Sequence, residues 1–185
     1  HKNIKNIAIE QINAAQLTSV GDSVNVVIQE KEINDYFSMS EVIGDTVIFH
    51  RDTTTGHKVN FVTIDNFYTN MYKDSTGSYA DFVIGLNISG YETVATIETK
   101  LVTTSGTTME FEFTEHAFNF GAVELDGELK NSFIDYLSTG LSHSEDSTIK
   151  LSNDKQSIIV DFADAISDSI YSTIIKKYYY KCGNY

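Results

Sequence analysis

The sequence predicts an α+β domain in which a curved antiparallel β-meander sheet has helices packed on one face. Residues 79–120 contain three successive segments in which apolar and polar side chains alternate at the two-residue period of a half-buried strand. Segments with helical spacing precede and follow this region. Because an antiparallel sheet commonly buries one face, we expect about six to eight strands with helices over the apolar face.

The length and composition indicate one globular domain. The chain has 185 residues, of which 41% are hydrophobic, so a substantial core is expected. We predict a single domain over residues 1–185, with an N-terminal helix inside residues 1–20 and a frayed tail at residues 176–185. The only cysteine, Cys182, excludes a disulfide within the chain.

The segments before the meander are assigned from their local patterns. Apolar residues at helical spacing predict a helix at residues 3–17, and residues 24–28 alternate as a short strand. Residues 30–38 are expected to form a helix, because their acidic first turn complements the helix dipole.

A hairpin is predicted next, within the Thr-, Asp- and Gly-rich residues 44–58. The strand that follows, at residues 59–72, changes its inward phase near Asp65 and Asn66. Such a change of phase predicts a β-bulge or a break in the strand at that point.

The meander strands each have one apolar phase. The residues that we expect to face inward are Ala80, Phe82, Ile84, Leu86 and Ile88, then Tyr91, Ala95, Ile97 and Leu101, then Met109, Phe111 and Phe113.

After the meander, we expect Asp126 to cap a helix that ends at Gly140 and buries Leu129, Phe133, Tyr136 and Leu137. Two short strands, at residues 148–151 and 158–162, and a last helix with a buried stripe at Ala163, Ile166, Ile170 and Ile174 complete the chain.

The net charge of −13 indicates that nucleic acid is not a partner, because an acidic surface repels the phosphate backbone. The histidines lack the spacing of a zinc site, and the glutamates of residues 110–112 and 124–128 do not form a calcium loop. Ser142, His143 and Asp146 are adjacent in a polar linker, where a catalytic triad is not expected to hold its geometry. We therefore predict a protein that is not an enzyme and has no catalytic residue, metal or cofactor.

One stretch of the chain resembles a known family. The helix with Glu32-Ile33-Asn34-Asp35-Tyr36, the long meander and the segment from Phe118 to Leu125 are similar to the YpmS-like proteins of Gram-positive bacteria. The resemblance covers roughly residues 25–140 and implies an extracytoplasmic protein held by one transmembrane anchor upstream of His1. The chain opens at His1 without an initiator Met, which is typical of a chain whose leader or anchor has been removed.

Two features suggest a binding function. The aromatic inner face of the meander could enclose an apolar or amphiphilic ligand in a cavity of at least ~300 Å³. The lining that we predict is Phe82, Ile84, Leu86, Ile97, Phe111, Phe113 and Phe133. The cationic and aromatic residues Lys176, Lys177, Tyr178 and Tyr179 could face a membrane surface.

We therefore predict a non-enzymatic extracytoplasmic binding module, anchored to the cell membrane, whose partner is an amphiphilic small molecule or an envelope protein. The alternative is a structural or protein-interaction domain with a filled core and no ligand.

Overall fold

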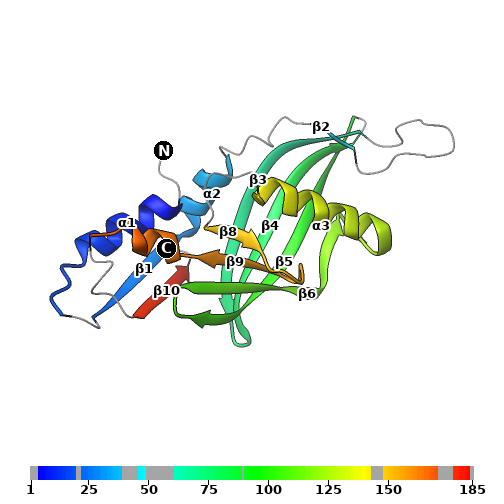
Figure 1. Cartoon of the computed structure of the whole chain (residues 1–185). Coiled ribbons are helices and arrows are strands. Elements are labelled where there is room, and N and C mark those ends of the chain that lie inside the picture. The colour runs from blue at the N-terminus through cyan, green and yellow to red at the C-terminus, as the bar shows by residue number, and fades with distance from the viewer. Residues whose placement is uncertain are drawn as a thin grey trace.

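The long strands of the chain form one curled antiparallel sheet (Figure 1). The computed structural model describes residues 4–19, 22–38, 46–48, 61–88, 90–142, 148–170 and 177–183. The centre of the sheet is made by β3 (Phe61–Asp74), β4 (Gly77–Ile88), β5 (Tyr91–Ser105) and β6 (Thr108–Phe120). Each of these strands pairs antiparallel with the next, which confirms the predicted meander.

Shorter strands extend both sides of the meander. They are β2 (Thr46–Ile48), β7 (Val123–Glu124), β8 (Ile149–Leu151) and β9 (Ser157–Asp161). The order across the sheet is β2-β3-β4-β5-β6-β9-β8, with β7 paired to the end of β6. β2 and β3 pair antiparallel, as predicted for the two arms of a hairpin, whereas the predicted turn between them lies outside the described residues.

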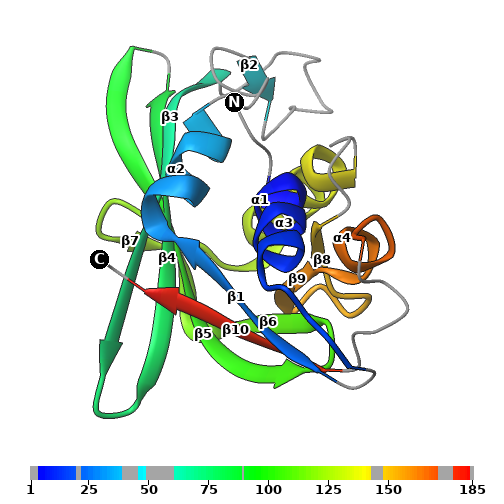
Figure 2. The ribbon, with the colours of Figure 1, turned by 90° about the vertical axis from the view of Figure 1, so that its left-hand side faces the viewer.

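The helices are α1 (Ile4–Ala14), α2 (Glu30–Ser38), α3 (Gly127–Ser142) and α4 (Ala163–Ser167). Figure 2 shows α1, α3 and α4 together on one side of the curled sheet. α1 buries four apolar residues at helical spacing, namely Ile4, Ile7, Ala8 and Ile12. The core therefore lies between the inner face of the sheet and these helices, which confirms the predicted fold class.

A second, two-stranded sheet joins the two ends of the chain. β1 (Ser23–Gln29) pairs in parallel with β10 (Lys177–Gly183), so the pair combines residues that are far apart in the sequence. The prediction of a frayed tail at residues 176–185 is therefore wrong for residues 177–183. Because this parallel pairing is non-local, no short-range pattern in the tail could indicate it.

The predicted bulge in β3 is confirmed. The register with β4 shifts between Ile64 and Asn66, which leaves Asp65 as the extra residue. Asn66 Oδ1 accepts a hydrogen bond of 3.1 Å from the backbone N–H of Gly85 on β4. A Cβ at Gly85 would lie 2.5 Å from that same oxygen, so only glycine fits beneath the Asn66 side chain.

Side-chain amides of two helices satisfy the backbone of neighbouring strands. In α1, Gln11 accepts from the N–H of Val27 at 2.7 Å and donates to its carbonyl at 2.6 Å. In α2, Asn34 makes the same pair of bonds to the N–H and the carbonyl of Thr69, at 2.5 and 3.1 Å. One carboxamide thus replaces one residue of a neighbouring strand, and α2 covers this edge of β3.

Three predictions of burial are wrong. Tyr91, the first residue of β5, is 80% exposed, and Leu129 on α3 is also exposed. The last helix ends at Ser167, and Ile170 beyond it is 70% exposed. Ile174, which we predicted to share its stripe, lies outside the described residues.

Candidate functional site

The residues that we predicted to line a ligand site all belong to the core. Phe82, Ile84 and Leu86 on β4, Ile97 on β5, Phe111 on β6 and Phe133 on α3 are buried, whereas Phe113 on β6 is partly buried. The assignment of these strand residues to the inner face is therefore confirmed, but they do not all surround one space.

Two of these residues belong to a separate group of aromatic rings. Phe118 on β6 packs edge to face against Phe113, at 4.9 Å between ring centroids, and against Phe133, at 6.0 Å. Phe120 also packs edge to face against Phe133, at 5.9 Å. These contacts are typical of ordinary aromatic packing, and through Phe133 they hold α3 against the inner face of β6.

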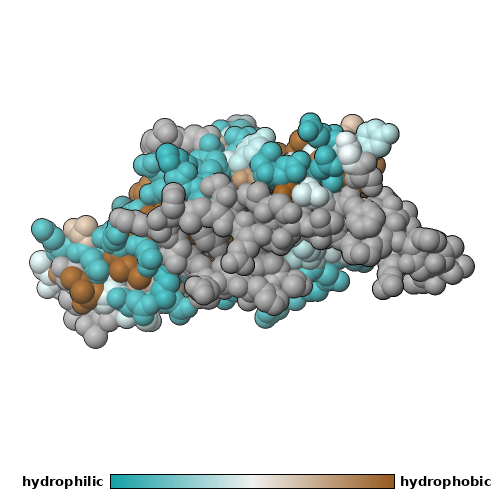
Figure 3. All heavy atoms as spheres, turned by 90° about the horizontal axis from the view of Figure 1, so that it is seen from above, coloured by the Kyte–Doolittle hydropathy of each residue, from teal (hydrophilic) through white to brown (hydrophobic). Residues whose placement is uncertain are grey.

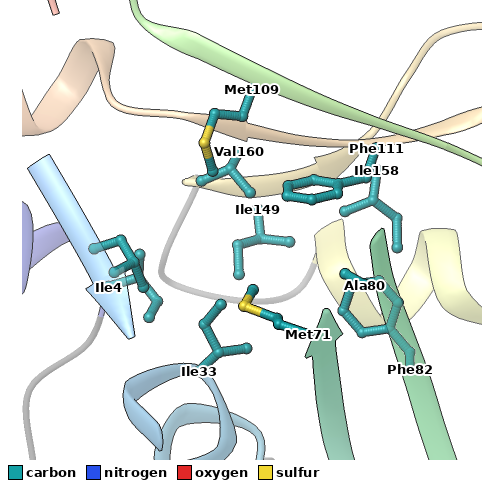
Figure 4. A pocket seen from close by; sticks show the side chains of 11 residues that line it. Ile4, Ile33, Met71, Ala80, Phe82, Met109, Phe111, Ile149, Ile158 and Val160 are labelled. Atoms are coloured by element: carbon teal, nitrogen blue, oxygen red, sulfur yellow. The ribbon is translucent and has the colours of Figure 1, made fainter. Parts of the chain in front are cut away.

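A small apolar cavity lies at the other end of the core, where α1, α2 and the sheet meet (Figure 4). Its volume is about 30 Å³, which is far below the ~300 Å³ expected for a ligand site. Of the predicted residues, only Phe82 and Phe111 line it, and the other walls include Ile4, Ile33 and Met71. A space of this size and apolar lining does not admit an amphiphile.

The residues that we predicted to face a membrane are at the C-terminal end. Lys177, Tyr178 and Tyr179 are opposite Ser23, Val24 and Asn25 in the β1–β10 register, whereas Lys176 lies outside the described residues. Their role at a membrane stays a prediction. Among the described helices, none is both long enough and apolar enough to cross a membrane.

The outer face of the meander carries exposed aromatic side chains. Tyr68 and Tyr72 lie four residues apart on the same face of β3, and they are 47% and 39% exposed. The ring of Tyr72 stacks on that of Tyr79 on β4, with centroids 5.1 Å apart and planes at 11°. Lys100 Nζ on β5 lies 5.7 Å from the centre of the Tyr79 ring, so this face already binds one cation through an aromatic ring.

Two carboxylates stand opposite each other beside these rings. Asp81 on β4 and Glu98 on β5 are direct cross-strand partners. Asp81 Oδ1 is buried and has no hydrogen-bond partner in the described part of the chain, and Glu98 accepts only a long hydrogen bond of 3.4 Å from Thr114. Loss of solvent, and then the charge of Glu98, raise the pKa of Asp81 to about 6.

Such a pair is unusual, because like charges directly opposite in an antiparallel ladder destabilise it. Within the ranges that the structure describes, no lysine or arginine forms an ion pair with either carboxylate. Burial, followed by the charges of Asp81 and Glu98, also raises the pKa of Tyr72, which shows that the rings and the carboxylates share one environment.

The sequence analysis did not identify this pair. The alternation of inward residues leaves Asp81 and Glu98 on the opposite phase, but it does not show that they stand opposite each other. The signal lies in the register of the hairpin between β4 and β5, in which Ile88 is paired with Tyr91.

Of the five histidines, the described residues include His116 alone. His116 pairs with Glu124 at 3.0 Å on the surface, and the hydrogen bond to Glu124 and its charge raise the pKa of this histidine. Over the described residues, no group of three His, Cys, Asp or Glu side chains could hold a metal ion. His50, His57 and His143, like Asp146, lie outside the described residues.

The chain was compared with protein-family models, curated proteins and solved structures, and none of them matches it. The resemblance to the YpmS-like proteins therefore stays a prediction, and any functional argument depends on the geometry of the chain itself.

Proposed function

We propose that this chain is a non-enzymatic protein-interaction domain that binds its partner on the outer face of the meander. The observation that carries the proposal is the contrast between a filled interior and an exposed, aromatic outer face. The cavity of about 30 Å³ gives an amphiphile no room, whereas Tyr68 and Tyr72 offer exposed aromatic area. Tyrosine is enriched at protein interfaces.

The filled interior favours this alternative over an enclosed ligand. A ligand site encloses most of its ligand, whereas Phe133 on α3 packs directly against Phe118 on the inner face of the sheet. Among the coloured atoms of Figure 3, hydrophilic residues predominate and hydrophobic ones form smaller groups. The outer face of β3–β5 is therefore the better candidate for an interaction surface.

Photo-cross-linking in the cell of origin tests the proposal. A photoreactive amino acid replaces Tyr68 on the outer face in one variant and Asn153, in an exposed turn, in a matched control. We expect a discrete protein adduct from position 68 and none from position 153. Equal adducts from both positions, or none from position 68, would contradict the proposal.

A thermal melt separates the proposal from ligand enclosure. Dodecylphosphocholine and oleate, below their micellar concentrations, should leave the melting temperature unchanged, because a ligand of the folded state alone would raise it. An increase with the logarithm of the amphiphile concentration would restore the ligand hypothesis.

For the location, we propose an extracytoplasmic, membrane-anchored protein whose partner is an envelope protein. Only the resemblance to the YpmS-like proteins supports this part. Fractionation of the cell of origin tests it, and recovery of the full-length product from the cytoplasm would contradict it.

A further inference from the structure

The described residues supply no counterion to the carboxylate pair on the outer face. Asp81 and Glu98 are direct cross-strand partners, and no cation of the described residues pairs with them. The nearest cation in the ladder, Lys100, lies over the ring of Tyr79 instead. This arrangement costs stability without any evident return inside the chain, which is the pattern expected of a functional position.

The aromatic rings beside the pair determine which cation fits best. A guanidinium is planar, pairs with carboxylates through two parallel hydrogen bonds and stacks on aromatic faces, whereas an ammonium is a compact and strongly hydrated charge. Tyr68 and Tyr72 are exposed beside Asp81 in the β3–β4 register. The face therefore offers both the carboxylates and the rings that arginine uses.

The charge of this region also excludes other partners. The chain has a net charge of −13, and the exposed Glu92 and Glu112 lie on the same outward phase of the sheet. Nucleic acid and anionic membranes are repelled by such a surface, whereas a cationic segment of a protein is attracted.

We propose that the outer face of β3–β5 binds an arginine-bearing segment of a partner protein, whose guanidinium pairs with Asp81 and Glu98 and stacks on Tyr72. This inference rests on the proposed function and adds the chemistry of the partner. The segment lies across the strands at the acidic pair and relieves the repulsion between the two carboxylates.

The ionisation of Asp81 gives the interaction a pH dependence. The groups that face Asp81 are Glu98 and Lys100 on β5, Tyr79 on its own strand and Tyr72 on β3. Because the pKa of Asp81 is about 6 in the free chain, the carboxylate is partly protonated at pH 5 and ionised at pH 7.5. A cationic segment should therefore bind more tightly at pH 7.5 than at pH 5.

Titration with a model peptide tests the proposal, using acetylated and amidated tetra-arginine as the probe. Amide shifts in a ¹⁵N-labelled sample report both where the peptide binds and how tightly. The double variant Asp81→Asn/Glu98→Gln removes the pair. The control Glu128→Gln/Asp126→Asn removes one Glu and one Asp from exposed positions at the start of α3, away from the outer face of the sheet.

We expect the largest shifts at residues 68–83 and 94–100, an affinity loss of at least about tenfold in D81N/E98Q and little change in the control. Tetra-arginine should also bind more tightly than tetralysine and spermine. Shifts spread evenly over the surface, equal losses in both double variants, or spermine binding as tightly as tetra-arginine would overturn the proposal.

Cross-linking from position 68 separates this inference from the function on which it rests. An adduct that D81N/E98Q weakens supports both proposals. An adduct that persists at full yield in D81N/E98Q overturns the arginine inference and leaves the interaction domain standing. A melting temperature that rises in D81N/E98Q without loss of binding also overturns it, since the pair would then be only a local repulsion.

Discussion

The inner and outer faces of β4 and β5 use adjacent residues of the same hairpin, yet they differ in how their cross-strand partners interact. On the inner face, Phe82 is opposite Ile97, and both are buried. One residue earlier on β4, Asp81 is opposite Glu98 on the outer face. The inner pair stabilises the sheet through burial, and the outer pair destabilises it through like charge.

This difference shows that packing against the helices constrains the residues of the inner face, whereas it does not constrain those of the outer face. The inner face is complementary to helices of its own chain, so its pairing can be optimised for stability. The outer face meets no helix in the described part of the chain (Figure 2), so an unfavourable pair there does not disturb the packing of the core. In our proposal, a partner protein uses this pair. Substitutions on each face, and on the edge between them, test this difference.

The largest effect is expected on the inner face. Phe111 is buried on β6 and touches the small cavity, so Phe111→Ala should lower the free energy of unfolding by about 3 to 5 kcal/mol. Glu112→Ala, one residue along on the outer face, is the matched control and should change it by less than about 0.5 kcal/mol. Urea titration measures both, and equal small effects would show that the strand phase is wrong.

Glu110 lies on the outer phase but should not behave like Glu112. The hydroxyl of the buried Ser157 donates a hydrogen bond of 2.6 Å to Glu110 Oε1. Glu110→Ala would leave this hydroxyl unpaired, at a cost of about 1 to 3 kcal/mol. A loss as small as that of Glu112→Ala in the same urea titration would show that the hydroxyl finds another partner.

An effect of similar size is expected at the edge of the sheet. Asn34→Ala removes both hydrogen bonds to the Thr69 backbone and should cost about 2 kcal/mol. The amide of Thr69 should then exchange with solvent faster, as measured by native-state hydrogen exchange. Asn70→Ala, at the exposed neighbouring position, is the control. Unchanged protection at Thr69 in the Asn34 variant would contradict the role of α2 as a cover of this edge.

The smallest effect, of opposite sign, is expected on the outer face. Asp81→Asn should raise the free energy of unfolding at pH 7 by about 0.5 to 1 kcal/mol, because it removes a partly buried charge and its like-charge contact with Glu98. Solvent screening keeps this gain below what the pKa shift alone implies, since Asp81 is partly exposed. The pKa of Asp81 is raised from 3.8 to about 6 in the folded chain, so the unfolded chain loses this proton first as the pH rises. The folded wild type is therefore destabilised relative to Asp81→Asn between about pH 4 and pH 6.

Urea titrations of wild type and Asp81→Asn across this range measure the difference. It should be near zero below about pH 4, grow towards pH 6 and then stay constant. Glu92→Gln serves as the control at an exposed carboxylate. A difference that does not depend on pH would show that Asp81 ionises normally and that its carboxylate is hydrated.

Much of the fold follows from sequence patterns within single helices and strands. The helix at residues 30–38, the alternation of the meander and the bulge beside Asn66 are all local, because periodicity reports directly which side of an element is buried. The errors lie at the ends of elements, as at the exposed first residue of β5, Tyr91, or where pairing is non-local, as between β1 and β10.

The candidate site shows the same limit. The inward set of the ligand prediction was recognisable, since Phe82 and Phe111 share their phase with other apolar residues. The free volume around them was not, because volume depends on how α1, α2 and α3 fill the concave side of the sheet.

By itself, the sequence determined the α+β class, the antiparallel meander and the faces that its residues occupy, because these depend on hydrophobic periodicity within each segment. Only the tertiary structure decided that the cavity beside α1 and α2 is small, that Gln11 and Asn34 satisfy strand backbones and that Asp81 stands opposite Glu98. These three features depend on contacts between segments distant in the sequence, and side-chain volume, edge hydrogen bonding and charge are settled where such segments meet.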